Sequence, residues 1–508
     1  MWGQILYRFW VNQLQGFMTT SRKKHAPRSA YVSQKQMTIT GFETPFSQNL
    51  DENNRWVVLA GKIPWDELAG IYLKRFSIKS TGRPPLNPRV VIGSIIIKHM
   101  CNLDDRETVA QISENMYMQY FLGYSSFCSE PPFDPSLFVE FRKRLGDEVI
   151  AEMNERIIAV SEGKDDKGDN DSSGDDNHKG TVIMDATACP QDIAYPTDLN
   201  LLSEAREISE RLIDTIYDPK VDVKKPRTYR KVARKEYLQT AQKKSPQRKT
   251  IRKAVGKQLR YLRRNLKSID KLLDRRGVFP LECKDQRYLM VIHTLYQQQL
   301  EMYEQKKHSV SDRIVSIHQP HVRPIVRGKL KAKVEFGSKI HVSLTNGFAY
   351  LDTISWNAFN ESSAMMDYIE QYRQRFGYYP EKVLADQIYC TRENRRKLKE
   401  LGIRLIAKPL GRPKAVADHV RPGQRNPIEG KFGQAKNAYG MNRIRARLKD
   451  TSQSWIASII MVLNLVKLAG EVPLCLLSFS AWEKLICEIF EKILRDSVVQ
   501  PILVYSEP

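Results

Sequence analysis

The sequence predicts an α/β core that one long helical block interrupts and that an all-α domain precedes. Three observations support this fold class. Short apolar runs with strand character alternate with helical periodicity in the second half of the chain, and one such run stands alone near residue 181. The stretch between them is basic and favours helix. The first third shows helical periodicity with Pro-rich breaks. A mixed sheet with flanking helices accounts for this order.

Residues 1–40 are expected to be a disordered or weakly ordered extension, and residues 41–160 an all-α domain. Pro64 stands just before a helical pattern, and the Pro-rich stretch 83–88 leads into a long apolar one. Pro131 to Ser136 then breaks the periodicity. The predicted helices cover residues 54–59, 65–76, 89–100, 108–114 and 117–122, and a further helix begins at Ser136.

An acidic linker is predicted over residues 161–179, which are rich in Gly, Asp, Asn and Ser. Part of it superficially resembles a calcium-binding EF-hand loop. Gly180 stands where that loop requires a bidentate Glu, and no helix follows directly, so we exclude calcium binding.

The α/β core is assigned to residues 180–204 and 333–470, the basic helical insertion to 205–332, and a C-terminal helical segment to 471–508. The dipeptide Asn346-Gly347 between two strand patterns signals a hairpin. The predicted strands cover 181–187, 192–195, 333–344, 348–356, 382–385 and 403–407. The predicted helices cover 201–216, 250–273, 288–306, 361–376 and 391–401; one more carries Glu429 and another starts near 454.

The charge of the chain points to a polyanionic partner. Its formal net charge is +23, and residues 220–276 hold 22 Lys or Arg against four acids. Such an excess fits nucleic acid, because cations that contact phosphates release counterions. The alternatives are a merely soluble basic protein and, for residues 220–276, a solvated helical face.

Cysteine usage and hydropathy restrict the compartment. The seven cysteines form no C-x-x-C pair, which fits free thiols in a reducing cytoplasm and not a disulfide framework or a zinc site. The most apolar stretch, 455–468, is too short to span a bilayer. Residues 1–18 lack the layout of a secretory signal. We therefore expect a cytoplasmic protein without a membrane segment.

Three acidic residues are candidate metal ligands. Asp185 and Asp386 stand at the ends of strand-like runs, and Glu429 stands in the first turn of a basic helix. Carboxylates held at a rigid sheet edge suit Mg²⁺, which prefers hard oxygen ligands. Two divalent ions can position an oxygen nucleophile and stabilise a leaving oxygen in phosphodiester chemistry. The pattern therefore predicts a site that cuts and joins nucleic-acid strands.

Each acid also has an ordinary explanation. Asp185 can satisfy turn amides, and Asp386 can cap a turn or helix. Glu429 can be the third residue of a capping-box-like start with Asn426 as N-cap and Pro427 as first helical residue. Lys436, seven residues on, favours the metal interpretation, since phosphates need such cations and a cap does not. His341 is interpreted as structural.

Several short motifs resemble one known family, the DDE transposases of prokaryotic insertion sequences, in particular the insertion-sequence-five group with its InsH-like N-terminal domain. The N-terminal motifs are Ile63-Pro64-Trp65, Gly82-Arg83-Pro84, Glu114-Asn115, Gln119 to Gly123 and Pro132 to Leu137. The core motifs are Met184 to Thr187, Ala385 to Tyr389, Leu410 to Pro413, and Arg425 to Gly430 with Lys436.

This resemblance implies an RNase-H-like catalytic core behind an all-α DNA-binding domain. It implies that Asp185, Asp386 and Glu429 are the catalytic triad and hold two Mg²⁺ or Mn²⁺ ions. Residues implied to bind DNA phosphates are Arg425, Lys436, Lys431 and Arg412. The family's signature tyrosine is Pro422 here, so the phosphate contact of that tyrosine is not implied.

The sequence thus predicts a transposase that binds terminal inverted repeats and target DNA as double strands. Metal-activated water cuts at the element ends, and the freed 3′-hydroxyl attacks target DNA in a second transesterification. Because two ends are joined at once, a homodimer on DNA is expected. The alternatives are a catalytically inactive DNA-binding relic and an RNase-H-like nuclease acting on RNA–DNA hybrids.

Overall fold

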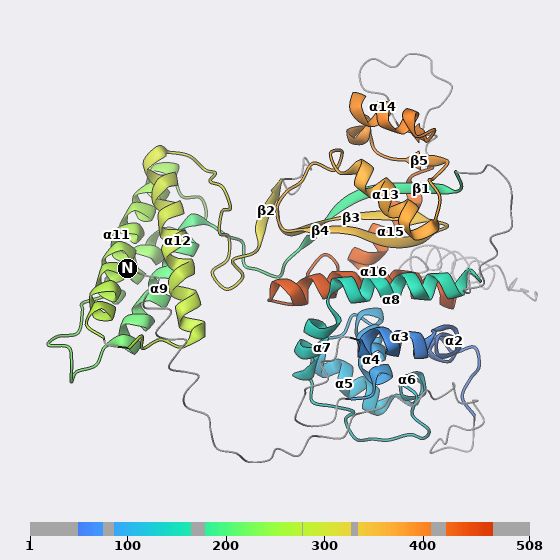
Figure 1. The fold of residues 1–508 in the computed structure, drawn as a ribbon. Helices are drawn as coiled ribbons and strands as arrows, with labels where there is room; N and C mark the ends of the chain where they lie inside the picture. Colours follow the sequence, from blue (N-terminus) through green and yellow to red (C-terminus); the bar gives the residue numbers. More distant parts are fainter. Residues whose placement is uncertain are drawn as a thin grey trace, which may run out of the picture.

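The structure is a computed structural model that describes residues 49–74, 86–163, 178–276, 278–326, 334–407 and 423–470. Within these ranges it has three parts, a helical domain, a sheet with flanking helices, and a separate helical bundle (Figure 1). The predicted extension 1–40, nearly all of the linker 161–179, the segment 471–508 and Arg412 lie outside the described residues.

The helical domain is all-α, as predicted. Asn54, Asn87, Asp104 and Asn115 each begin a helix by accepting hydrogen bonds from the first free amides with their side chains. Its helices are α2 (Arg55–Lys62), α3 (Trp65–Leu73), α4 (Pro88–Met100), α5 (Asp105–Glu114), α6 (Met116–Phe121), α7 (Leu137–Leu145) and α8 (Asp147–Ser161). The sequence interpretation missed the break at Gly146, whose φ of +36° ends α7 and starts α8.

A mixed sheet forms the core of the second part. Its strands are β1 (Thr181–Pro190), β2 (Arg323–Val326), β3 (Val334–Thr345), β4 (Phe348–Ser355), β5 (Lys382–Leu384) and β6 (Arg404–Ile406). The order is β2-β3-β1-β5-β6, and β4 pairs with β3. β3 runs antiparallel to β1, β2 and β4, whereas β5 runs parallel to β1 and β6. This confirms the predicted mixed sheet with helices.

Helices cover both faces of this sheet. Helices α13 (Met365–Phe376) and α14 (Arg392–Glu400) connect β4, β5 and β6; Met365, Tyr368 and Ile369 of α13 pack with Val182 and Met184 of β1. On the other face lie α15 (Asn426–Asn437) and α16 (Lys449–Ala469). Parallel pairs need such crossover helices, whereas β3 and β4 are joined by Asn346 and Gly347, both with positive φ.

Two local expectations for the core are wrong. Residues 192–195 form no strand, because the chain leaves the sheet after Pro190. The helix expected from 361 begins only at Met365, because residues 361–364 form a turn before it.

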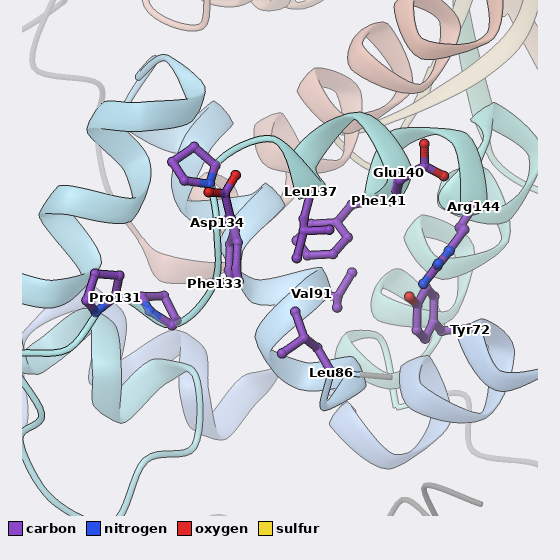
Figure 2. Close-up of a pocket in the computed structure, with 12 residues that line it drawn as sticks. Tyr72, Leu86, Val91, Pro131, Phe133, Asp134, Leu137, Glu140, Phe141 and Arg144 are labelled. Atoms are coloured by element: carbon purple, nitrogen blue, oxygen red, sulfur yellow. The ribbon is translucent and has the colours of Figure 1, made fainter. Parts of the chain in front are cut away.

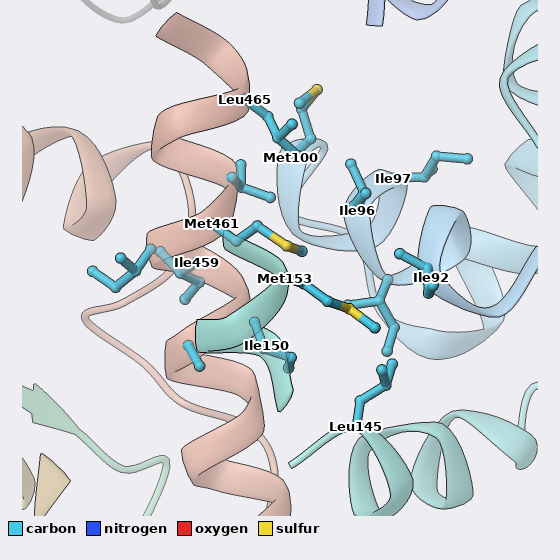
Figure 3. Packing of buried hydrophobic residues seen from close by; sticks show 14 of the residues in the cluster. Ile92, Ile96, Ile97, Met100, Leu145, Ile150, Met153, Ile459, Met461 and Leu465 are labelled. Atoms are coloured by element: carbon cyan, nitrogen blue, oxygen red, sulfur yellow. The ribbon is translucent and has the colours of Figure 1, made fainter. Parts of the chain in front are cut away.

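Helix α16 joins the helical domain to the sheet in one hydrophobic core (Figure 3). Ile459, Met461 and Leu465 of α16 pack in the same cluster as Ile96 of α4 and Met153 of α8. α16 has the length and hydropathy of a membrane-crossing helix, but 78% of its most apolar window is buried inside the fold. Its apolar surface therefore serves as the core between two layers. The sequence argument that this stretch is too short to span a bilayer is wrong, because the helix extends from Lys449 to Ala469.

A buried amide fixes α16 to the edge strand β4. The Asn464 side chain accepts a hydrogen bond from the Ala349 amide at 2.8 Å and donates to the Ala349 carbonyl at 2.7 Å. It also donates to the Asn154 side chain of α8 at 2.9 Å. The free edge of β4 is thereby hydrogen-bonded by helix side chains.

The insertion is a four-helix unit with its own core, made of α9 (Asp198–Ile216), α10 (Arg230–Ala241), α11 (Arg248–Asp274) and α12 (Cys283–Gln305). In α11 the apolar side chains face this core, whereas most of its Lys and Arg are exposed. Gly256 allows close packing, because a Cβ there would lie 2.5 Å from the Tyr303 hydroxyl of α12. A helical insertion is thus observed, but its predicted bounds 205–332 are wrong at both ends. It begins with α9 at Asp198, within the stretch assigned to the α/β core, and residues 323–326 belong to the sheet as β2.

Candidate active site

The strand register brings Asp185 and Asp386 together at one edge of the sheet. Ile183 of β1 pairs with Leu384 of the parallel strand β5, and each aspartate follows two residues later. β5 ends at Leu384, but β1 continues to Pro190, so Asp185 lies within its strand, opposite Val342 of β3, and not at a strand end as predicted. The two acids come side by side where β5 ends. The sequence prediction that these two acids meet is in keeping with this register.

The Arg425 guanidinium lies between the two acids. Its Nη2 atom is 2.9 Å from Oδ2 of Asp185, and its Nη1 atom is 3.3 Å from Oδ1 of Asp386. The Arg425 and Asp185 side chains are 16% and 19% exposed, whereas Asp386 is 55% exposed. A single internal cation therefore neutralises both candidate ligands, one of them largely out of water.

Burial raises the pKa of the Asp185 carboxyl above its ordinary value, although Arg425 and the Ala186 amide act in the opposite direction. Glu361 and Asp386 add to the rise, Glu361 more strongly. The site is therefore a place where negative charge accumulates and where an added cation is stabilised.

Glu361 is an acid of this region that the sequence interpretation missed. Its side chain is 15% exposed and pairs with Lys339 of β3 at 2.7 Å. Glu361 and Asp185 also contribute, after burial, to raising the pKa of the Tyr389 hydroxyl. It lies in the turn before α13, where the sequence analysis expected the first residue of a helix and not a member of the site.

Glu429 lies one helical turn beyond Arg425. Arg425 is the N-cap of α15 without a side-chain cap bond, and Asn426 and Pro427 are the first two helical residues. The capping-box explanation of Glu429 is therefore wrong, because Asn426 is not the cap. Glu429 is exposed. Among the described residues no group of three or more His, Cys, Asp or Glu side chains is close enough to hold a metal ion.

The local explanations for the two aspartates hold, but they are incomplete. Asp185 accepts a hydrogen bond from the Ala186 amide at 2.8 Å, and Asp386 caps the short helix η2 (Gln387–Tyr389) through the Gln387 amide at 2.7 Å. Each carboxylate also binds Arg425, Asp185 through its other oxygen and Asp386 through a second lone pair of the same oxygen. The amide hydrogen bonds therefore orient the acids and leave them able to bind a cation.

Three other predicted residues have different surroundings. Lys431 donates to the Leu463 carbonyl of α16 at 3.3 Å, and burial, helped by Lys467, lowers its pKa to about 8. Lys436 is half-buried on α15. His341 is fully buried, pairs with Asp352 at 2.8 Å and stacks on Tyr368, which fits the structural role expected for it.

A separate cavity of about 680 Å³ lies in the helical domain (Figure 2). Tyr72, Leu86, Phe133 and Phe141 line it, and Arg144 stands at one side. None of the predicted site residues takes part in it. It is bounded by the residues on either side of 75–85, which the structure does not describe.

Comparisons with known proteins place the chain in a family. A model described as "Transposase DDE domain" matches residues 383–466, which include Asp386, Arg425 and Glu429. A model described as "Transposase domain (DUF772)" matches residues 44–144 of the helical domain.

A relative in Rhizobium meliloti, named "Uncharacterized protein ORF8 in nfe locus", is 32% identical over 160 residues. The match covers 30% of this chain and 70% of the relative. No solved structure matches the chain. From the helical domain, the acid-bearing sheet edge and these matches, it follows that the chain belongs to the DDE transposases of insertion sequences.

Proposed function

We propose that this protein binds the terminal inverted repeats of its insertion sequence and catalyses metal-dependent strand cleavage and strand transfer. One observation carries the proposal. Asp185 of β1 and Asp386, which follows β5, come from segments far apart in the chain and meet around one cation. The order of strands and their directions also fit an RNase-H-like core, which we propose for the sheet.

The two aspartates fit a divalent metal by donor type. Mg²⁺ takes hard oxygens and is commonly held by one or two carboxylates, with water and substrate phosphate supplying the rest. The Arg425 guanidinium already lies between these two carboxylates, so the position accommodates a positive charge. We propose Asp185, Asp386 and Glu429 as the residues that hold two Mg²⁺ or Mn²⁺ ions. Such ions supply Lewis-acid activation of an oxygen nucleophile and of the leaving oxygen.

Residues of the chain itself would orient the DNA. Arg425 and Lys436 lie on the segment that carries Glu429, so a phosphate held by them is positioned next to the acids. Lys431 and Arg412 are proposed to add further phosphate contacts. The exposed cations of α10 and α11 would bind the backbone outside the site, which gives affinity with little sequence information. The helical domain is proposed to read the inverted repeats.

Two further properties belong to this proposal. Joining two ends in one reaction requires two sets of acids at one place, so we propose that a homodimer assembles on DNA. The substrate is a chromosomal duplex, so the proposed location is the nucleoid of a prokaryotic cytoplasm. Free cysteines agree with that compartment.

The test uses duplexes that carry the inverted repeats flanking the gene. Asp185→Asn, Asp386→Asn and Glu429→Gln are each expected to abolish Mg²⁺-dependent strand cleavage on a denaturing gel, while band shifts show end binding within a few-fold of wild type. The matched control is Asp192→Asn, an acid paired with Arg443 near the surface, which should cleave normally. Retained cleavage in any of the first three variants would falsify its assignment as a ligand.

A further inference from the structure

Two loops are locked together at one end of the insertion bundle. One loop, residues 217–229, joins α9 to α10, and the other, residues 275–282, joins α11 to α12. Arg276 donates to the Ile216 carbonyl at 2.7 Å and pairs with Asp222 at 2.5 Å. The Asp222 side chain is fully buried. This buried ion pair fixes the two loops to each other, because its loss would leave an unpaired charge out of water.

Large apolar side chains are exposed on both of these loops. Val221 and Val223 flank Asp222 and are 54% and 99% exposed. Val278 and Phe279 follow Arg276 and are 73% and 46% exposed. Single exposed apolar residues are common on protein surfaces. Four of them on two joined loops form a cluster that water solvates poorly and that a partner would bury.

Cations surround this cluster. Lys220 and Lys224 are exposed in the first loop, Lys225 also pairs with Asp214, and Arg275 in the second loop is 56% exposed. We name the four apolar residues together with these four cations the bundle tip. Both acids of the first loop are engaged, Asp222 with Arg276 and Asp218 with the Lys220 amide. Glu282 of the second loop is also exposed, but the four cations outnumber it and the outward charge of the bundle tip is positive.

We propose that the bundle tip inserts its apolar side chains into a groove of duplex DNA while its cations contact the flanking phosphates. This inference rests on the proposed function. DNA-bending proteins use apolar wedges of this kind between or against base pairs, with Lys and Arg on the backbone. A second copy of the chain would bring like charges together at the same surface, so charge favours DNA as the occupant.

The proposal separates two contributions to DNA affinity by their dependence on salt. The slope of log affinity against log salt changes by about 0.9 for each phosphate contact. Replacing apolar residues removes no phosphate contact and leaves the slope unchanged. Replacing two cations, Lys220→Gln and Lys224→Gln, should reduce the slope by about 2.

The experiment uses the full chain and a duplex with one inverted repeat, labelled at both ends for energy transfer. Val278→Ser with Phe279→Ser is expected to weaken binding about tenfold at every salt concentration and to reduce the bend of the bound duplex. Met290→Ser removes a residue of similar exposure, 72%, from α12 outside the bundle tip and should leave binding and bending as in wild type. Equal thermal midpoints show that all variants are folded.

Three outcomes would overturn the proposal. In the first, the Val278→Ser/Phe279→Ser variant binds and bends DNA like wild type. In the second, its slope changes as much as that of the lysine variant. In the third, sedimentation of the DNA-free chain shows that the apolar variant loses self-association while DNA bending is unchanged, which makes the bundle tip a contact between copies. Binding of wild-type protein to the same duplex is measured in the same series. If the wild-type chain does not bind DNA at all, the proposed function fails; if it binds, the three outcomes above concern the bundle tip alone.

Discussion

Replacing Arg425 with Gln removes the cation that Asp185 and Asp386 share. The variant keeps a polar but shorter side chain and leaves two carboxylates, and Glu361 near Asp185, without that positive charge. We expect the DNA-free variant to be less stable than wild type and to bind a divalent cation more tightly. Both effects have one cause, since the guanidinium and the metal compete for the same oxygens.

The size of the stability effect follows from the burial of each pair. Removing one partner of a fully buried pair costs roughly 3–5 kcal/mol. Asp185 and Arg425 are 19% and 16% exposed, which places their pair below that range, at about 2 kcal/mol. Asp386 is 55% exposed, so its pair adds less than about 1 kcal/mol. The expected loss at neutral pH is therefore about 2–3 kcal/mol.

The loss should depend on pH in a defined direction. The folded pKa of Asp185 is raised above its ordinary 3.8, and Arg425 is the main influence that limits the rise. A carboxyl with a raised folded pKa contributes stability that is present below its unfolded pKa and lost as pH rises through its folded pKa. Removing Arg425 raises the folded pKa further. The difference between variant and wild type should thus be small near pH 4 and grow as pH rises above it.

Urea unfolding at several pH values, with and without excess Mn²⁺, measures both effects. We expect Mn²⁺ to bind the DNA-free variant about tenfold more tightly than wild type, which adds about 1.4 kcal/mol of metal-induced stabilisation. Arg443→Gln, which breaks the exposed pair with Asp192, should show neither change. Equal stability of Arg425→Gln and wild type at pH 7, with equal stabilisation by Mn²⁺, would refute the reasoning.

Two further predictions concern the packing of α16. Asn464→Leu should lower the free energy of unfolding in urea by about 3 kcal/mol, because the buried Ala349 amide loses its hydrogen-bond partner and the Ala349 carbonyl loses one of its two donors. The control Gln453→Leu, at a half-buried position of the same helix, should cost less than about 1 kcal/mol. Lys431→Met should stabilise the protein by about 1 kcal/mol at pH 7, because the buried lysine is charged there and its lowered folded pKa destabilises the fold. The gain should shrink as pH rises from about 8 toward 10.5, because the lysine of the wild-type protein then becomes neutral. A gain at pH 10 as large as at pH 7 would contradict the lowered pKa of Lys431.

The helices and strands were predictable where local signals are strong. Asn54 and Asn87 cap helices that the apolar pattern also marks, and Asn346-Gly347 forms the expected hairpin. The sequence interpretation failed where tertiary contacts decide. Nothing local shows that the apolar helix α16 is buried between the helical domain and the sheet, because periodicity cannot reveal what covers a helix that is apolar on all sides.

The candidate site was predictable only in part, for a related reason. Asp185 and Asp386 stand out because each follows a short apolar run, although only Asp386 follows the end of a strand and Asp185 lies within β1. The pairing of Arg425 with both depends on three separate segments and leaves no sequence signal. Glu361 was expected to begin a helix, and no motif indicated that this acid lies near Asp185, because that proximity depends on the tertiary fold.

The start of α15 links the two states that the proposed function requires. Arg425 and Glu429 are four residues apart, so they lie on the same side of one helix, about one turn from each other. In the DNA-free protein the arginine neutralises the aspartates. A DNA phosphate that draws the Arg425 guanidinium away would remove the positive charge from the two aspartates. The same movement of the start of α15 would open the aspartate pair to a metal ion and bring up Glu429, which does not group with the two aspartates in the DNA-free protein. DNA would be needed to start that movement.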